Sequence, residues 1–172
     1  MACLGGANLG ATAYPLIFTY QEIVRGKGFL AAVQTRGRAL MVREDGEWWM
    51  YGAQPGGLDE GGASFEEARL KFREAFREIL FDIAASVVNF AEFERDVQRF
   101  VTEPSEPMVS RWQAAVELIR SKKMIVESPL DQLPRQPNEN EVEVLVAELK
   151  EPAKSQPTDN RADYYAIPAL AA

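Results

Sequence analysis

The side chains with the most chemical potential in this chain are carboxylates on either side of two tryptophans. A hard divalent cation such as Mg²⁺ binds oxygen ligands, so converging carboxylates could support a metal-dependent hydrolase. Acids beside a tight turn are, however, commonly solvated or part of the turn itself. We therefore expect no metal and no other cofactor, and we keep the hydrolase as an alternative. The acidic residues concerned are Glu44, Asp45, Glu47, Asp59 and Glu60.

Other kinds of catalytic centre lack their usual residues. The 172 residues include no histidine, which is the commonest general base and a frequent transition-metal ligand. The single cysteine, Cys3, allows neither an internal disulfide nor a thiolate cluster. Ser64 has no histidine to activate it, and the glycine pairs at 56–57 and 61–62 do not open a phosphate-binding loop, because no Lys-Ser/Thr follows them. The sequence predicts no catalytic residue, and it assigns these glycines to backbone geometry.

Trp48 and Trp49 are the strongest candidates for binding. Neighbouring residues of a strand point to opposite faces of its sheet, so one indole can enter the core while the other stands on the surface. An exposed aromatic side chain is an effective anchor for a protein partner, although most aromatic residues on strands serve as core filling. The predicted partner-binding residues are Trp48, Trp49, Tyr51, Tyr164 and Tyr165.

A hairpin must position the two tryptophans. Asp45-Gly46 separates the apolar runs 38–44 and 47–51. This dipeptide is a strong signal for a two-residue turn between antiparallel strands, since both turn residues must accept a positive φ. The sequence therefore predicts two adjacent antiparallel strands at these positions.

A long helix follows the hairpin. Ser64 and Glu67 form a capping box, in which the Ser64 hydroxyl accepts from the amide of residue 67 and Glu67 reaches back to the amide of Ser64. Apolar residues then recur at helical spacing to about Ala85. We expect this helix to pack on the sheet through Phe72, Phe76 and Ile79.

Shorter patterns predict the remaining elements. In order, they are strands at 14–23, 29–33 and 39–42, with a tight connection at 35–38; a very short edge strand at 58–59; two further helices within about 89–123; a short strand at 124–126; and a last strand at 142–149 that could join an edge of the sheet.

The composition is that of a single globular domain, with 47% apolar and 26% charged residues. No apolar run is long enough to span a membrane, so we expect a cytoplasmic protein. A formal charge of −7 argues against direct binding to nucleic acid. The predicted division is a flexible leader at 1–13, one α+β domain at 14–149 with a helical insertion at about 89–123, and an extended tail at 150–172.

The order of turn, strand, Pro-Gly crossing and capped helix resembles the HicB-like antitoxin domain of bacterial toxin–antitoxin systems. The resemblance implies an α+β fold with an antiparallel sheet of about four to five strands packed by one long helix, similar to a ribonuclease-H fold that has lost its catalytic carboxylates. It also implies that the protein binds and blocks a small RNA-cleaving toxin. The matching residues are Asp45-Gly46-Glu47-Trp48-Trp49-Met50-Tyr51, Gln54-Pro55-Gly56-Gly57, Glu60 to Ala68 and Arg73-Glu74-Ala75-Phe76.

These observations favour a non-catalytic protein-binding protein that sequesters or scaffolds a partner. The partner would be another protein, such as a small toxin, or a second copy of the chain in a homo-oligomer. The expected contact surfaces are an open edge of the sheet, the outward-facing one of the two tryptophans, and the terminal segments. The alternatives are a metal-dependent, ribonuclease-H-like hydrolase acting on nucleic acid, and a structural subunit of a larger assembly.

Overall fold

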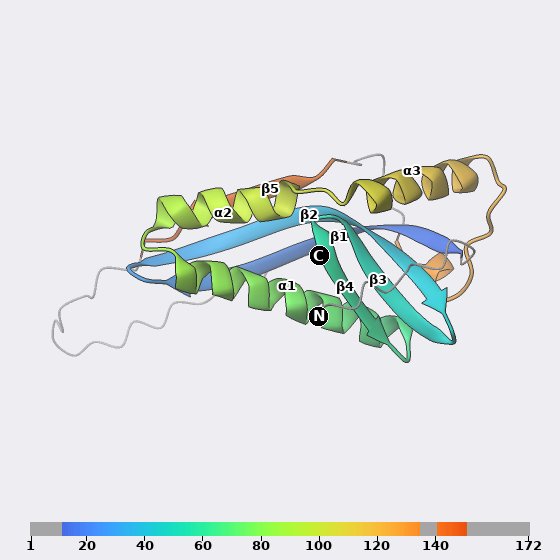
Figure 1. The fold of residues 1–172 in the computed structure, drawn as a ribbon, viewed down its shortest axis with the longest axis horizontal. Helices are drawn as coiled ribbons and strands as arrows, with labels where there is room; N and C mark the ends of the chain where they lie inside the picture. The colour runs from blue at the N-terminus through green and yellow to red at the C-terminus, as the bar shows by residue number, and fades with distance from the viewer. Residues whose placement is uncertain (1–11, 135–140, 151–172) are drawn as a thin grey trace, which may run out of the picture.

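The fold is α+β: a five-stranded antiparallel sheet with three α-helices (Figure 1). The structure, a computed structural model, describes residues 12–134 and 141–150. The strands are β1 (Ala13–Gly26), β2 (Phe29–Glu44), β3 (Glu47–Gln54), β4 (Gly56–Gly62) and β5 (Glu143–Glu148). The helices are α1 (Phe65–Ser86), α2 (Phe90–Thr102) and α3 (Glu106–Arg120), with a short 3₁₀ turn at Leu130–Gln132.

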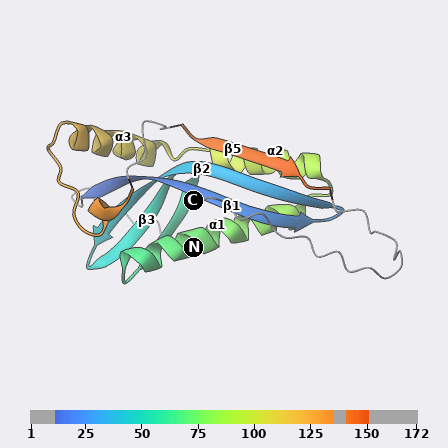
Figure 2. The same cartoon turned by 180° about the vertical axis from the view of Figure 1, so that it is seen from behind.

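The long strand β2 is the centre of the sheet. β1 pairs with it from Gly26↔Phe29 to Ala13↔Val42. On its other side, the first half of β2 pairs with β5 and the second half pairs with β3, which in turn pairs with the edge strand β4. Figure 2 shows β5 and β3 following β2 at different points along its length. The predicted last strand is thus confirmed as a member of the sheet.

The tight connection predicted at 35–38 is wrong, because β2 runs through these residues without a break. Gly37 explains why a turn-like stretch can stay in a strand. A Cβ at Gly37 would lie 2.4 Å from the Phe18 ring and 2.6 Å from the Gln54 carbonyl oxygen, so the backbones approach closely there. The register against β3 also shifts between Arg38 and Ala39. Glycine here marks an irregularity within a strand, where pairing on both sides outweighs the local turn preference.

The turn and cap signals of the sequence are confirmed. Asp45 and Gly46 have φ values of 50° and 88°, as a two-residue hairpin turn requires. The Ser64 hydroxyl accepts from the Glu67 amide at 3.1 Å. The return bond differs by one residue, because the Glu67 carboxylate accepts from the amide of Ala63 at 2.9 Å rather than from that of Ser64. Helix α1 therefore begins where the capping box predicts.

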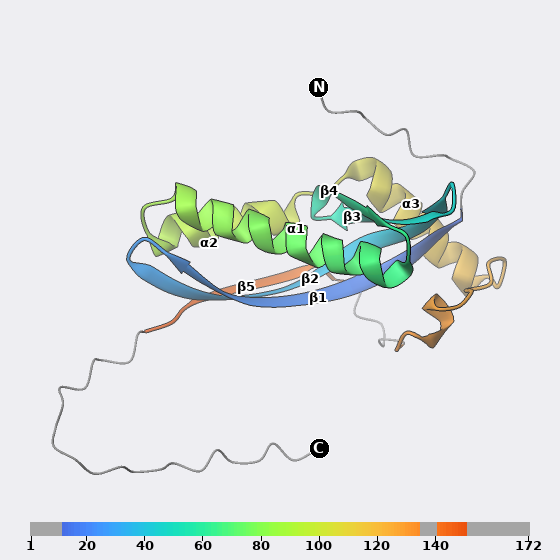
Figure 3. The ribbon, with the colours of Figure 1, turned by 90° about the horizontal axis from the view of Figure 1, so that it is seen from below.

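Helices cover the two faces of the sheet unequally. We call the face that carries Ala39 and Met41 the inner face, and the face that carries Leu40 and Val42 the outer face. Helices α1 and α2 pack on the inner face and build the larger core, whereas α3 packs on the outer face at the end formed by β1, β2 and β3 (Figure 3). The largest fully buried side chains of the inner face include Phe72, Phe76, Phe93 and Leu80.

The connection between α2 and α3 leads from the inner to the outer face, and it passes beside the turn between β3 and β4. The amide of Gly56 donates to the Glu103 carbonyl at 2.8 Å, and the amide of Ser105 donates to the Ala53 carbonyl at 2.9 Å. A Cβ at Gly56 would lie 2.4 Å from the Ser105 nitrogen. Glycine at this position is therefore needed for backbone packing, in agreement with the role predicted for the glycine pairs.

Two strand predictions need correction. Residues 124–126 form no strand. The amides of Lys123 and Met124 instead donate to the Leu118 carbonyl at 2.9 and 3.1 Å, which closes the end of α3. β4 is also longer than the predicted residues 58–59, because the flanking glycines continue the pairing with β3.

Candidate functional site

Trp48 and Trp49 lie on opposite faces of β3, as strand alternation predicts. Trp48 belongs to the inner face, where its ring meets Phe65 edge-on with centroids 6.1 Å apart. Trp49 lies on the outer face and stacks on Tyr51, with centroids 6.1 Å apart and ring planes 17° from parallel. Both outer-face rings are partly exposed. Of the two tryptophans, Trp48 is thus half-buried against the main core, and Trp49, which packs on neither buried cluster, is the candidate anchor.

The indole of Trp49 lies over the edge strand β4. Trp49 pairs with Gly61 in the register of the sheet, and a Cβ on Gly61 would come within 2.8 Å of a ring carbon. The missing side chain leaves the space in which the indole rests, a known way in which an aromatic side chain compensates for a glycine in a strand. We call Trp49, Tyr51 and Gly61 the aromatic margin. It extends to the edge of the sheet, since among the described strands β4 pairs only with β3.

A hydrogen bond and nearby charges set the properties of Tyr51. Its hydroxyl donates to Glu44 Oε2 at 3.2 Å. Burial raises the pKa of Tyr51 to about 12, with further contributions from the charges of Glu44 and Asp59, while Arg111 opposes the shift. The phenol therefore remains protonated at neutral pH. Tyr51 is suited to donating a hydrogen bond and is unsuited to acting as a general base.

Two buried charged atoms lie close to the aromatic margin. Glu44 Oε1 and Arg111 Nη1 are both shielded from solvent, and neither has a hydrogen-bond partner among the described residues. Arg111 belongs to α3, so the docking of this helix on the outer face is what brings a guanidinium toward Tyr51. Sequence reasoning missed Arg111. The only local signal is its place on the same helix face as Met108 and Ala115, which pack toward the sheet.

The acidic residues proposed as a metal site do not form one group. Asp45 sits in the hairpin turn. Glu44, Glu47 and Asp59 belong to the outer face, whereas Glu60 pairs with Met50 on the inner face. Within residues 12–134 and 141–150, no group of three or more His, Cys, Asp or Glu side chains is arranged to hold a metal ion. Strand alternation thus separates Glu60 from Asp59, its neighbour in the sequence.

The long edge of the sheet at β1 is partly occupied by the protein's own side chains. Arg73 of α1 donates to the Thr19 carbonyl at 3.1 Å, and Glu22 accepts from the Ile23 amide at 3.2 Å. Pro15 has no amide hydrogen to offer. These features limit strand pairing at this edge, as is common for edge strands in natural sheets. The aromatic margin lies at the opposite edge, formed by β4.

Comparisons with protein-family models, with curated proteins and with solved structures found no match to this chain. Among the helices that the structure describes, none is both long and apolar enough to cross a membrane. The remaining predicted binding residues, Tyr164 and Tyr165, lie outside the described residues, as does almost all of the predicted leader at 1–13.

Proposed function

We propose that this protein is a non-catalytic protein-binding protein, similar in role to the HicB-like antitoxins, and that the aromatic margin holds its partner. The observation that carries the proposal is the position of Trp49, a large and partly exposed ring that rests on the glycine of an edge strand. A partner segment that lies along β4 would meet both unpaired backbone groups and this indole. Strand addition at an edge, combined with an aromatic anchor, is a recurring mode of protein recognition.

The charges around the margin favour a basic partner. Glu44, Glu47 and Asp59 share the outer face with Trp49, and the whole chain has a formal charge of −7. A lysine or arginine side chain of the partner could lie on the indole and pair with one of these carboxylates. A small RNA-cleaving toxin, the partner that the family resemblance implies, would have such a surface, because binding a phosphate backbone requires clustered cations.

The two alternative functions make different demands. A metal-dependent hydrolase needs converging carboxylates, and among the described residues no group of three or more acidic side chains is arranged to hold a metal ion. A structural subunit would use the same margin, and it would differ from a sequestering protein only in the number of copies assembled. The geometry therefore supports binding over hydrolysis.

Affinity capture with a matched pair of variants tests the proposal. Tagged wild-type protein, Trp49→Ala and Leu70→Ala are each used as bait, and captured proteins are identified by mass spectrometry. Leu70 is an exposed apolar residue of α1 and serves as the control. A partner held at the margin should bind wild type and Leu70→Ala alike. The purified partner should bind Trp49→Ala about 30-fold more weakly than wild type, since a central aromatic anchor is typically worth about 2 kcal/mol.

Two results would contradict the proposal. One is a partner whose affinity is unchanged by Trp49→Ala. The other is cleavage of RNA or DNA that depends on Mg²⁺ or Mn²⁺ and is abolished by Glu44→Gln or Asp59→Asn, which would establish the hydrolase instead. Light scattering on the purified chain, alone and with its partner, then separates a sequestering complex from a larger assembly.

A further inference from the structure

The outer face has a second region, which no described helix covers. Where β1, β2 and β5 lie side by side, Ile23 pairs with Ala32 and Ala32 with Ala147, while Gln21 pairs with Gln34 and Gln34 with Leu145. We call these six residues the open patch. Ile23 and Leu145 are 59% and 62% exposed. Three adjacent strands thus present an apolar row, Ile23, Ala32 and Ala147, beside a second row in which two glutamines precede Leu145.

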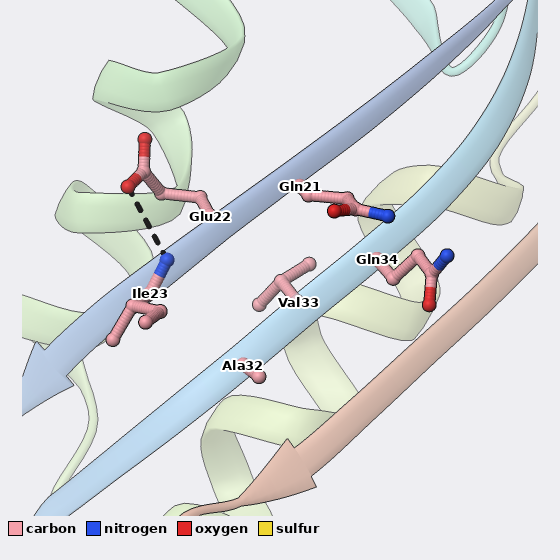
Figure 4. Close-up of a pocket in the computed structure, with 6 residues that line it drawn as sticks. All are labelled: Gln21, Glu22, Ile23, Ala32, Val33 and Gln34. Carbon is pink, nitrogen blue, oxygen red and sulfur yellow. Dashed lines mark hydrogen bonds between the residues drawn. The ribbon is translucent and has the colours of Figure 1, made fainter. Parts of the chain in front are cut away.

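The open patch is shallow and lies beside the main core. A depression of about 360 Å³ is lined by Gln21, Ile23, Ala32 and Gln34, together with Glu22 and Val33. Figure 4 shows these side chains on β1 and β2, with helices passing behind the strands. Helix α2 packs on β5 from the inner face, and α3 packs on β1, β2 and β3. The open patch therefore lies beyond the end that α3 covers, and the row of Thr19, Arg36 and Glu143 separates the two regions.

We propose that residues 164–170 of this same chain cover the open patch. This segment contains Tyr164, Tyr165, Ile167 and Leu170. A tyrosine ring can pack on Ile23 or Leu145 while its hydroxyl bonds to a glutamine amide, which offers both a donor and an acceptor. The segment and the patch thus have matching chemistry: apolar surface with a few hydrogen-bonding groups. The inference does not depend on the proposed function.

The path of the chain suits this occupant. Leu149 follows β5, and its amide donates to the Leu30 carbonyl at 2.7 Å, so the chain leaves the sheet at one end of the open patch. The residues from 151 to 163 can span at most about 43 Å at about 3.3 Å per residue. The patch extends only about 13 Å from Leu149 to Leu145 at the same rise. The intervening residues are therefore long enough to turn back and place residues 164–170 over the patch.

The size of the open patch argues against a second copy as its occupant. Three strands about 4.8 Å apart, over the same length of about 13 Å, cover roughly 190 Å². A stable interface between two proteins buries about 800 Å² on each partner. A tethered segment needs less contact area, because its effective concentration beside the patch reaches the millimolar range.

Paramagnetic broadening in NMR spectra tests the proposal. A nitroxide is attached at Thr19→Cys in a Cys3→Ser background, so that the label has one site, and the control label is placed at Leu70→Cys on α1. Thr19 lies on the same strand and face as Gln21 but outside the open patch, and both labelled positions are exposed, so labelling should disturb neither the fold nor the patch. We expect the amide signals of residues 164–170 to be lost with the label at 19 and retained with the label at 70. A further sample mixes isotope-labelled protein that has no nitroxide with nitroxide-labelled protein at natural abundance.

Each outcome decides the matter. If the 164–170 signals are lost with the label at 19, are retained with the label at 70 and are also retained in the mixed sample, the result supports coverage within one chain. Signals that stay at full intensity with the label at 19, or that are lost equally with both labels, overturn the proposal. Broadening that also appears in the mixed sample overturns it as well, because the segment would then come from a second copy.

Discussion

The two faces of the sheet use the same strands for different purposes. On the inner face, α1 and α2 bury a continuous set of aromatic and aliphatic side chains, and Phe76 alone contacts the rings of Phe18, Tyr20 and Phe100. On the outer face, α3 seals only one end, around Leu40 and Trp112. The remainder of that face includes the aromatic margin and the open patch. The comparison indicates that the larger buried core is on the inner face, and the surface proposed for partner binding lies on the outer one.

This division follows from strand alternation combined with the number of helices. Each residue added to β2 places one side chain on each face. Two helices meet the inner face, so large residues there are buried. One helix meets the outer face, and its Trp112 indole donates to the Leu16 carbonyl at 3.1 Å, which fixes α3 at that end. Substitutions on the inner face should therefore lower the free energy of unfolding more than substitutions on the outer face.

The largest effect is expected for Phe76→Ala on the inner face. Phe76 is 1% exposed, and its removal leaves a cavity among three aromatic rings. The free energy of unfolding should fall by about 3–5 kcal/mol, measured by chemical denaturation. Leu70→Ala, on the solvent side of the same helix, is the control and should change it little. A loss below about 1 kcal/mol for Phe76→Ala would mean that this face is not the main core.

The next effect concerns alkaline pH and involves both faces. Burial first, and then the neighbouring Glu22 or Glu44, raises the pKa of Tyr20 and of Tyr51 from 10.0 to about 12. Between these values the folded state keeps protons that the unfolded state has lost, so stability is fully present below pH 10 and falls as the pH rises toward 12. Unfolding measured at several alkaline pH values should show this decline. Tyr51→Phe should make the decline shallower, and an unchanged slope would contradict the role of Tyr51.

A smaller effect is expected for Trp49→Ala on the outer face. The indole stacks on Tyr51 and rests on Gly61 without entering either buried cluster. Loss of the stacking should lower the free energy of unfolding by about 1 kcal/mol. This loss is smaller than the one expected for Phe76→Ala, although tryptophan is the larger side chain. Denaturation of Trp49→Ala beside Phe76→Ala measures the contrast between the faces directly. Equal losses would remove the distinction between a stabilising and a recognising face.

The smallest effect is a gain, expected for Thr35→Val on the inner face. Thr35 is 2% exposed, and its hydroxyl oxygen has no hydrogen-bond partner among the described residues. Valine has a similar shape and no polar group to desolvate, so the free energy of unfolding should rise by up to about 1 kcal/mol. Thr19→Val, at an exposed position of β1, is the matched control and should change stability less. A loss of stability in Thr35→Val would show that the hydroxyl is satisfied in solution.

Local signals in the sequence predicted most of the elements. Asp45-Gly46 and the Ser64 cap depend on interactions within a few residues, and both appear in the structure, although the return bond of Glu67 is to the amide of Ala63. Residues 35–38 were mistaken for a turn because the pairing that keeps them in β2 comes from strands distant in the sequence. For the candidate site, alternation predicted that Trp48 and Trp49 separate, and it could not say which of them faces the core.

The sequence by itself determined the elements whose causes are local: the hairpin, the capped helix α1, the amphipathic helix α2 and the opposite directions of the two tryptophans. Tertiary structure alone decided which partners these elements meet. It placed Trp48 against the core because α1 packs on the inner face, and it brought Arg111 toward Tyr51 because α3 lies on the outer face. The physical reason is that long-range packing depends on how whole faces fit together, and no short stretch of sequence contains that information.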